Sequence, residues 1–119
     1  MPLLVVDAAN VVGSVPDGWW RDRVGATERV RDGLLLLPTL AGVSPPFEVV
    51  LVVEGRARGV ASVPGVRVVA ARGSGDDTIV DVVREEGAGR PCLVATADRE
   101  LCGRVEALGA VVVGPKQVR

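Results

Sequence analysis

The stretch Leu-Leu-Val-Val-Asp-Ala-Ala-Asn, residues 3–10, decides the expected fold. Its four consecutive apolar residues are typical of a strand that is covered on both faces in the middle of a parallel sheet. Asp7 follows this strand directly, where an ionised carboxylate is costly unless it is paired, hydrogen-bonded or bound to a metal. Asn10 could reach back to orient that carboxylate. An equally good explanation is that Asp7 only opens an Asx-turn out of the strand.

The composition indicates one domain with an aliphatic core. The chain has 119 residues, of which 48% are hydrophobic and 3% aromatic, which suffices for a single core over residues 1–119. The formal net charge of -1 gives no overall basic signal, so a nucleic acid would have to be bound by a local patch. We expect neither a transmembrane span nor a signal peptide, and therefore a cytoplasmic location.

The absence of histidine narrows the chemistry. It excludes Ser-His and Cys-His nucleophilic sites as well as His-ligated zinc or iron. Because tyrosine is absent too, acid–base chemistry is left to carboxylates, two thiols, one lysine and metal-bound water. Cys92 and Cys102 are too isolated for a zinc site or a disulfide framework, and we expect both to be small core residues of a reduced protein.

Apolar runs and helical patterns alternate along the chain. After the first strand, further strands are predicted at residues 48–54, 66–70, 92–95 and 110–113. Helices are predicted at residues 26–40, 76–86 and 98–108, the first of them bending or ending near Pro38. This alternation predicts an α/β fold with a mostly parallel sheet of about five strands. The carboxyl ends of such strands lie on one edge of the sheet, where ligands bind.

Acidic residues come where several of these strands end. They are Asp7, Glu54, Asp76, Asp77 and Asp98, with Thr96 beside the last and Asp81 one helical turn beyond Asp77. Helix capping and the helix dipole would explain the acids at helix starts one at a time, but they explain neither Asp7 nor the shared edge. Crowded carboxylates repel one another unless a cation lies among them. Oxygen ligands without nitrogen or sulfur donors favour Mg²⁺ or Mn²⁺, which can activate water for phosphodiester hydrolysis.

Three motifs resemble those of a known family, the NYN group of PIN-like ribonucleases. Val5-Val6-Asp7-Ala8-Ala9-Asn10 resembles its D-x-x-N opening, Asp77-Thr78-Ile79-Val80-Asp81 is similar to the acidic pair on its central helix, and Thr96-Ala97-Asp98-Arg99 to its late T/S-x-D motif. The motifs occur in the family's order and cover most of the chain. The resemblance implies a PIN-like, Rossmann-like α/β/α sandwich and a metal-dependent endoribonuclease that hydrolyses RNA with a metal-activated water.

The resemblance also implies a role for each motif residue. Asp7, Asp77 and Asp98 are then the ligands of Mg²⁺ or Mn²⁺, and Asp81 supports them. Asn10 orients Asp7, and Thr96 tunes the site.

An RNA substrate also needs groups that hold the strand. Trp19 and Trp20 could stack on bases, and nearby arginines could pair with phosphates. A tryptophan pair is as readily a packing lid with one ring buried, and exposed arginines are commonly solvated surface. The residues that we retain as substrate-binding candidates are Arg21, Arg72, Arg99 and Trp19.

Three functions follow from the sequence, in order of preference. The first is the metal-dependent ribonuclease, with RNA as its partner. The second is a non-catalytic RNA-binding or interaction module on the same fold. The third is phosphate or nucleotide binding by Gly73-Ser74-Gly75 at a helix N-terminus, which ranks last because Asp76 and Asp77 would repel the phosphate. No membrane partner is expected, and a homodimer is left open.

Overall fold

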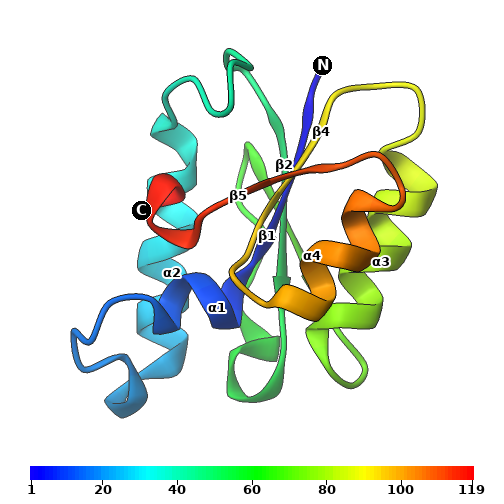
Figure 1. The fold of residues 1–119 in the computed structure, drawn as a ribbon. Coiled ribbons are helices and arrows are strands. Elements are labelled where there is room, and N and C mark those ends of the chain that lie inside the picture. The colour runs from blue at the N-terminus through cyan, green and yellow to red at the C-terminus, as the bar shows by residue number, and fades with distance from the viewer.

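The computed structural model describes residues 1–119 as an α/β/α sandwich around one parallel sheet (Figure 1). The sheet has five strands in the order β3-β2-β1-β4-β5, and all neighbouring strands are parallel. The strands are β1 (Leu3–Asp7), β2 (Glu48–Val53), β3 (Val66–Ala70), β4 (Cys92–Ala95) and β5 (Val111–Val113). The predicted fold class is therefore confirmed.

Two pairs of helices cover the two faces of the sheet (Figure 1). The α-helices are α1 (Ala8–Gly13), α2 (Arg23–Gly33), α3 (Gly75–Glu86) and α4 (Arg99–Glu106). Short 3-10 helices are η1 (Trp19–Arg21), η2 (Leu34–Leu36), η3 (Gly55–Gly59) and η4 (Pro115–Val118). No helix combines the length and the apolar character that crossing a bilayer requires.

Strand β1 lies at the centre of the sheet and contributes to the core on both faces. Its four apolar residues are completely buried. Because side chains alternate across a strand, Leu4 and Val6 pack with the residues of α1 and α2, whereas Leu3 and Val5 pack with those of α3 and α4. The apolar run at the start of the chain thus joins the two halves of the core.

The order of the strands reverses at β1. The chain runs outward from β1 to β2 and β3, returns through α3 to β4 on the other side of β1, and ends with β5. In an open parallel sheet, ligands bind in the crevice outside the carboxyl ends of the two strands at such a reversal. Here these strands are β1 and β4, so the residues that follow Val6 and Ala95 border the crevice.

Helix α1 is an element that the sequence does not predict. It begins directly after β1, and Asp7 is its N-cap, whose side chain accepts a hydrogen bond from the backbone N–H of Asn10. A helix this short is not stable alone. Burial of Val11 and Val12 in the core holds it in place.

Helix α2 lies earlier in the chain than the predicted helix over residues 26–40. Asp22 is its N-cap and accepts a hydrogen bond of 2.9 Å from the backbone N–H of Gly25. The α-helix ends at Gly33 and is followed only by the 3-10 turn η2. Pro38 explains the early end, because proline cannot donate a helical hydrogen bond and disfavours helical dihedral angles at Leu37.

Two smaller differences concern the connections that leave the sheet. Strand β2 ends at Val53 rather than Glu54, and α4 begins at Arg99 with Asp98 as its N-cap. Both acids therefore lie in the segments that follow the carboxyl ends of strands, as the prediction of an acidic edge requires.

Candidate functional site

Asp7 is the buried acid of this edge. Asp7 is only 8% exposed, because it ends β1, which lies between β2 and β4 in the sheet. Its carboxylate accepts hydrogen bonds from the Thr96 hydroxyl at 2.9 Å and from the backbone N–H of Asn10 at 3.3 Å. These contacts fix both oxygens without adding a positive charge.

Thr96 and Asn10 connect this carboxylate to the loop between β4 and α4. The Thr96 hydroxyl, which is buried, also accepts a hydrogen bond from the backbone N–H of Asp98 at 3.2 Å. The side-chain carbonyl of Asn10 accepts one from the backbone N–H of Ala97 at 2.9 Å. Asn10 therefore contacts Asp7 through its backbone, while its side chain positions the loop that carries Asp98. The expected contact of Asn10 with Asp7 is therefore made by its backbone N–H and not by its side chain.

Glu54 and Asp76 extend the acidic edge toward α3. Glu54 follows β2, and its carboxylate accepts a hydrogen bond from the backbone N–H of Gly75, the first residue of α3. A side chain at Gly75 would lie only 3.3 Å from a Glu54 oxygen, so a residue without Cβ allows this close approach. Asp76 comes next, in the first turn of α3, and is half-buried.

Burial and neighbouring carboxylates raise the pKa of Asp7 and of Asp76. Burial is the main cause that raises the pKa of Asp7, and the charges of Asp76 and Glu54 add to it, while the hydrogen bonds from Thr96 and Asn10 act in the opposite direction. Burial also raises the pKa of Asp76 most strongly, followed by the charges of Asp98 and Glu54. We call Asp7, Glu54, Asp76 and Asp98 the acidic cluster.

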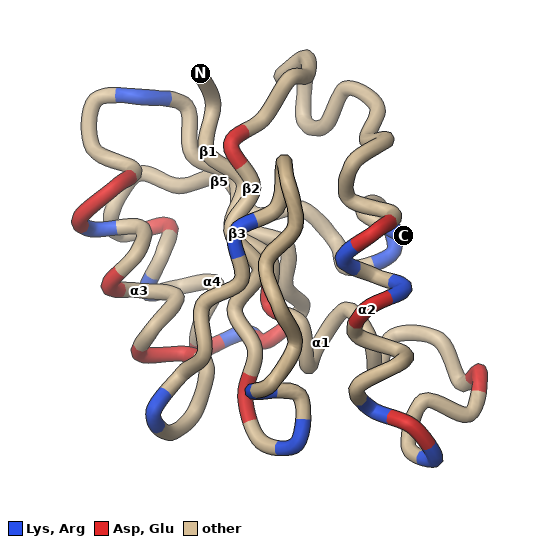
Figure 2. Tube along the Cα trace, turned by 180° about the vertical axis from the view of Figure 1, so that it is seen from behind, with Lys and Arg blue, Asp and Glu red and all other residues tan.

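Little positive charge compensates this cluster. Arg104 of α4 lowers the pKa of Asp76, but its guanidinium forms its ion pair with Asp77 at 2.9 Å. Figure 2 shows acidic segments at the end of β2 and at the start of α3, along the edge where the strands end. The cluster therefore holds more negative charge than the surrounding side chains neutralise, which is the electrostatic condition for a bound cation.

Asp77 and Asp81 lie outside the acidic cluster. The Asp77 side chain is 80% exposed and paired with Arg104. The Asp81 side chain is 60% exposed and paired with Arg84 at 3.1 Å. Of the expected ligands, Asp7 and Asp98 thus belong to the acidic cluster, whereas Asp77 and Asp81 lie outside it.

Helical periodicity carries the signal that distinguishes Asp76 from Asp77. Residues three, four and seven positions after Asp76 are Ile79, Val80 and Val83, which are all buried, and such spacings place residues on one face of a helix. Four positions after Asp77 comes the exposed Asp81. The face of α3 that packs on the sheet therefore begins with Asp76.

The donor set fits a hard divalent cation, although no preformed cage exists. No group of three or more His, Cys, Asp or Glu side chains is close enough to hold a metal ion without rearrangement. Mg²⁺ usually keeps several waters and is bound through only one or two carboxylates. The acidic cluster supplies carboxylates with uncompensated charge, so Asp7, Asp76 and Asp98 are the groups from which the one or two carboxylate ligands would come.

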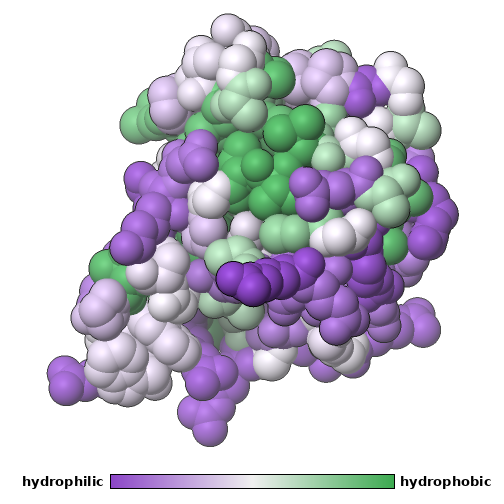
Figure 3. Space-filling model, viewed as in Figure 1, coloured by the Kyte–Doolittle hydropathy of each residue, from purple (hydrophilic) through white to green (hydrophobic).

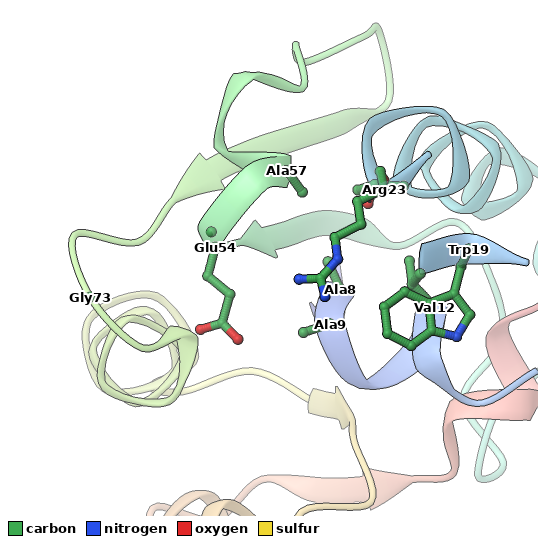
Figure 4. Close-up of a pocket in the computed structure, with 10 residues that line it drawn as sticks. Ala8, Ala9, Val12, Trp19, Arg23, Glu54, Ala57 and Gly73 are labelled. Carbon is green, nitrogen blue, oxygen red and sulfur yellow. Dashed lines mark hydrogen bonds between the residues drawn. The ribbon is translucent and has the colours of Figure 1, made fainter. Parts of the chain in front are cut away.

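A cavity of about 380 Å³ opens beside the acidic cluster. It lies between α1, the start of α2, η3 and the loop before α3. Figure 4 shows the Glu54 carboxylate on one side and the Arg23 guanidinium and the Trp19 ring on the other, with Ala8 beside the guanidinium and Ala57 on the side of η3. Glu54 thus belongs to both the acidic cluster and the cavity.

The substrate-binding candidates differ in their surroundings. Trp19 is half-buried against the core and packs edge-to-face on Trp20, with ring centroids 5.8 Å apart. Trp20 is 51% exposed, so one ring packs and the other faces solvent. Arg21 is exposed, as are Arg72 and Arg99 next to the acidic cluster, so all three guanidiniums are accessible to phosphate.

The surface around β5 has a different character. Figure 3 shows apolar side chains gathered near this edge strand and hydrophilic ones toward the lower edge of the molecule. Val111 of β5 and Leu108 before it are among the exposed large apolar residues. The apolar surface and the acidic cluster therefore belong to separate regions.

The two cysteines do not contribute to the site. Both are free; Cys92 is buried and Cys102 half-buried. Burial raises the pKa of both thiols, so they remain protonated and unreactive at neutral pH.

Comparisons with known proteins establish the fold. No protein-family model matches the chain, and no curated protein matches it in sequence. Among solved structures, the chain is similar to the W164L mutant of Rae1 (YacP) from Bacillus subtilis, with a TM-score of 0.76 and 18% sequence identity over 99% of this chain and 72% of that chain. At this identity the similarity shows the fold alone.

Proposed function

We propose that the chain is a metal-dependent endoribonuclease that hydrolyses RNA phosphodiesters with Mg²⁺ or Mn²⁺. The observation that carries the proposal is the acidic cluster, in which Asp7 is buried at the reversal of strand order and shares uncompensated negative charge with Asp76 and Glu54. The sequence motifs that resemble the NYN group of PIN-like ribonucleases support the same activity.

The ligands that we assign to the metal are Asp7, Asp76 and Asp98. When bound, Mg²⁺ or Mn²⁺ would lower the pKa of a water molecule and stabilise the charge that develops on the phosphodiester. Asp7 accepts its hydrogen bonds from neutral groups, so its negative charge stays available to the cation. Asp98 is half-buried and fixed by its capping bond from the backbone N–H of Leu101 at 3.0 Å.

Other residues position these ligands. Thr96 holds Asp7 and the backbone of Asp98 at once, and Asn10 fixes the loop between β4 and α4. To Asp77 and Asp81 we assign a structural role on the outer face of α3. Hydrogen bonds that orient ligands in this way commonly change metal affinity or activity about 10- to 100-fold.

RNA is the substrate that the surface around the site favours. Arg72 and Arg99 are exposed in the segments that lead to Asp76 and follow Asp98, and Arg21 lies in the same short helix as Trp19, which lines the cavity. Arginine pairs well with phosphate, and aromatic rings stack on unpaired bases. Phosphate contacts from these arginines would offset the repulsion between RNA and the acidic cluster.

The test is metal-dependent cleavage by the variant Asp7→Asn. We expect wild type to cleave single-stranded RNA with Mn²⁺ and not with EDTA, and Asp7→Asn to lose at least about 100-fold of this activity, more than loss of a positioning residue costs. Glu85→Gln, which changes an exposed acid of α3, is the matched control and should retain cleavage. Circular dichroism checks that all three proteins fold.

The alternative function, a non-catalytic RNA-binding module, predicts a different result. It would bind RNA equally with and without Mn²⁺ and would show no cleavage that depends on Asp7. That outcome would replace the ribonuclease with the binding module.

A further inference from the structure

The cavity beside the acidic cluster has walls of opposite charge. Glu54 lies on one side and Arg23 on the other (Figure 4), and no ion pair joins them although both line the same space. The Arg23 guanidinium instead lies over the Trp19 ring, 5.2 Å from its centroid. The cavity thus separates a hydrogen-bond acceptor from a donor.

The size and lining of the cavity suit a single flat base. At about 380 Å³ it lies at the small end of ligand sites, which span about 300–1,000 Å³. The small side chains of Ala8 and Ala57 leave its middle open, while Trp19 and the guanidinium of Arg23 form one wall. Unpaired RNA bases are bound in this way, by stacking on aromatic rings and guanidinium planes.

The Glu54 carboxylate matches one base better than the other three. Guanine has two adjacent donors, N1–H and N2–H, which a carboxylate can accept together. Adenine and cytosine present a ring nitrogen lone pair beside their amino group, which a carboxylate repels, and uracil has only one donor on this edge. The Glu54 carboxylate accepts only one hydrogen bond from the protein, from the backbone N–H of Gly75, so it retains free acceptor positions.

We propose that this cavity binds an unpaired guanine base of the RNA substrate, with Glu54 reading its edge and the Arg23 guanidinium, backed by the Trp19 ring, forming the stacking wall. The inference rests on the proposed ribonuclease function, which it extends to substrate specificity. Because Glu54 lies in both the cavity and the acidic cluster, a guanine bound there brings its own backbone phosphate next to the proposed metal ligands.

The experiment measures nucleoside binding without metal, so that it does not depend on cleavage. The full chain carrying Trp20→Phe keeps Trp19 as its single tryptophan and is titrated in EDTA with guanosine, adenosine, cytidine and uridine. These nucleosides lack a phosphate and avoid repulsion by the acids. We expect guanosine to quench Trp19 fluorescence saturably and to bind at least about ten-fold more tightly than the others, since hydrogen bonds to charged groups differ from unmatched ones by about 1.5–3 kcal/mol.

Two variants in the same background assign the preference to the cavity. Glu54→Gln should abolish the preference for guanosine, because its amide presents a donor to the base donors, and Glu85→Gln should retain it. Equilibrium dialysis of wild type with the same nucleosides checks that Trp20→Phe has not altered the cavity. Equal affinities for the four nucleosides, or no binding in both measurements, would overturn the proposal.

The outcomes for the cavity and for the catalytic function are separable. Guanosine preference without any RNA cleavage in Mn²⁺ would contradict the ribonuclease and keep the guanine site. Cleavage in Mn²⁺ without guanosine preference would contradict the guanine site and keep the ribonuclease.

Discussion

Asp76 and Asp77 are neighbours in the chain, yet they lie in opposite surroundings at the start of α3. Asp76 is half-buried, and burial and the nearby acids raise its pKa. Asp77 is 80% exposed and forms an ion pair with Arg104. The backbone turns by about 100° per residue along an α-helix, which is enough to move one carboxylate from the crevice to the solvent.

The difference shows that burial and charge balance, rather than membership of a motif, distinguish a candidate ligand from a surface acid. An exposed ion pair contributes at most about 1 kcal/mol and leaves neither partner short of counter-charge. The acids of the cluster lack such partners. A cation bound among them would therefore lower the free energy of the folded protein as well as serve the reaction.

The largest expected effect is a difference in RNA cleavage between variants of Asp76 and variants of Asp77. Asp76→Asn should reduce Mn²⁺-dependent RNA cleavage at least about 100-fold, more than changes that only position a ligand, whereas Asp77→Asn should leave it within about two-fold because only an exposed ion pair is lost. The measurement is kcat/KM on one RNA for both variants. Equal losses, or a larger loss in Asp77→Asn, would restore the ligand set that the sequence motif suggested.

A second effect concerns the hydrogen bonds that position Asp7. Thr96→Val removes the hydroxyl that contacts both Asp7 and the Asp98 backbone, and should lower kcat about 10- to 100-fold. Because this hydrogen bond lowers the pKa of Asp7, its loss should also move the acidic limb of the pH profile to higher pH. Thr96→Ser retains a hydroxyl and should restore both properties. An unshifted pH profile in Thr96→Val would contradict the positioning role.

The smallest effect is on stability, which Asp7→Asn should increase although the same substitution lowers activity. The folded pKa of Asp7 lies above its ordinary value of 3.8, so the folded state binds more protons than the unfolded state and loses stability as pH rises through the raised pKa. Asp7→Asn removes the charge and keeps groups that can hydrogen-bond to Asn10 and Thr96. In metal-free buffer it should therefore raise Tm by a few degrees at neutral pH, about 4 °C for each kcal/mol.

The stability gain should shrink as pH falls toward 3.8, because the Asp7 carboxyl of the wild type then loses its charge and resembles the neutral asparagine. Thermal unfolding at neutral and acidic pH measures it. A lower Tm for Asp7→Asn at neutral pH would show that the carboxylate is not under electrostatic strain in the absence of metal.

The sequence predicts the strands well because each is a short, continuous apolar run. Their order depends on which strands pair in space, and local patterns do not contain it. Helix α1 is missed because Ala8–Gly13 is short, and its stability comes from the Asp7 cap and from tertiary burial of Val11 and Val12. Helix α2 is misplaced because the cap at Asp22 was not recognised.

The site is predictable in outline but not in detail. The strand ends fix the positions of Asp7 and Asp98, and the sequence identifies both. The choice between Asp76 and Asp77 requires the phase of α3, which the buried residues after Asp76 contain. The cavity could not be predicted, because Glu54 and Arg23 meet only through the packing of η3 against α2.

The central claim is that the acidic cluster is a site for a hard divalent cation, and calorimetric titration with Mn²⁺ in the absence of RNA tests it most directly. We predict saturable binding by wild type and by Asp77→Asn, and binding at least about ten-fold weaker by Asp7→Asn and Asp76→Asn. Equal binding by all four proteins, or no binding by wild type, would contradict the claim.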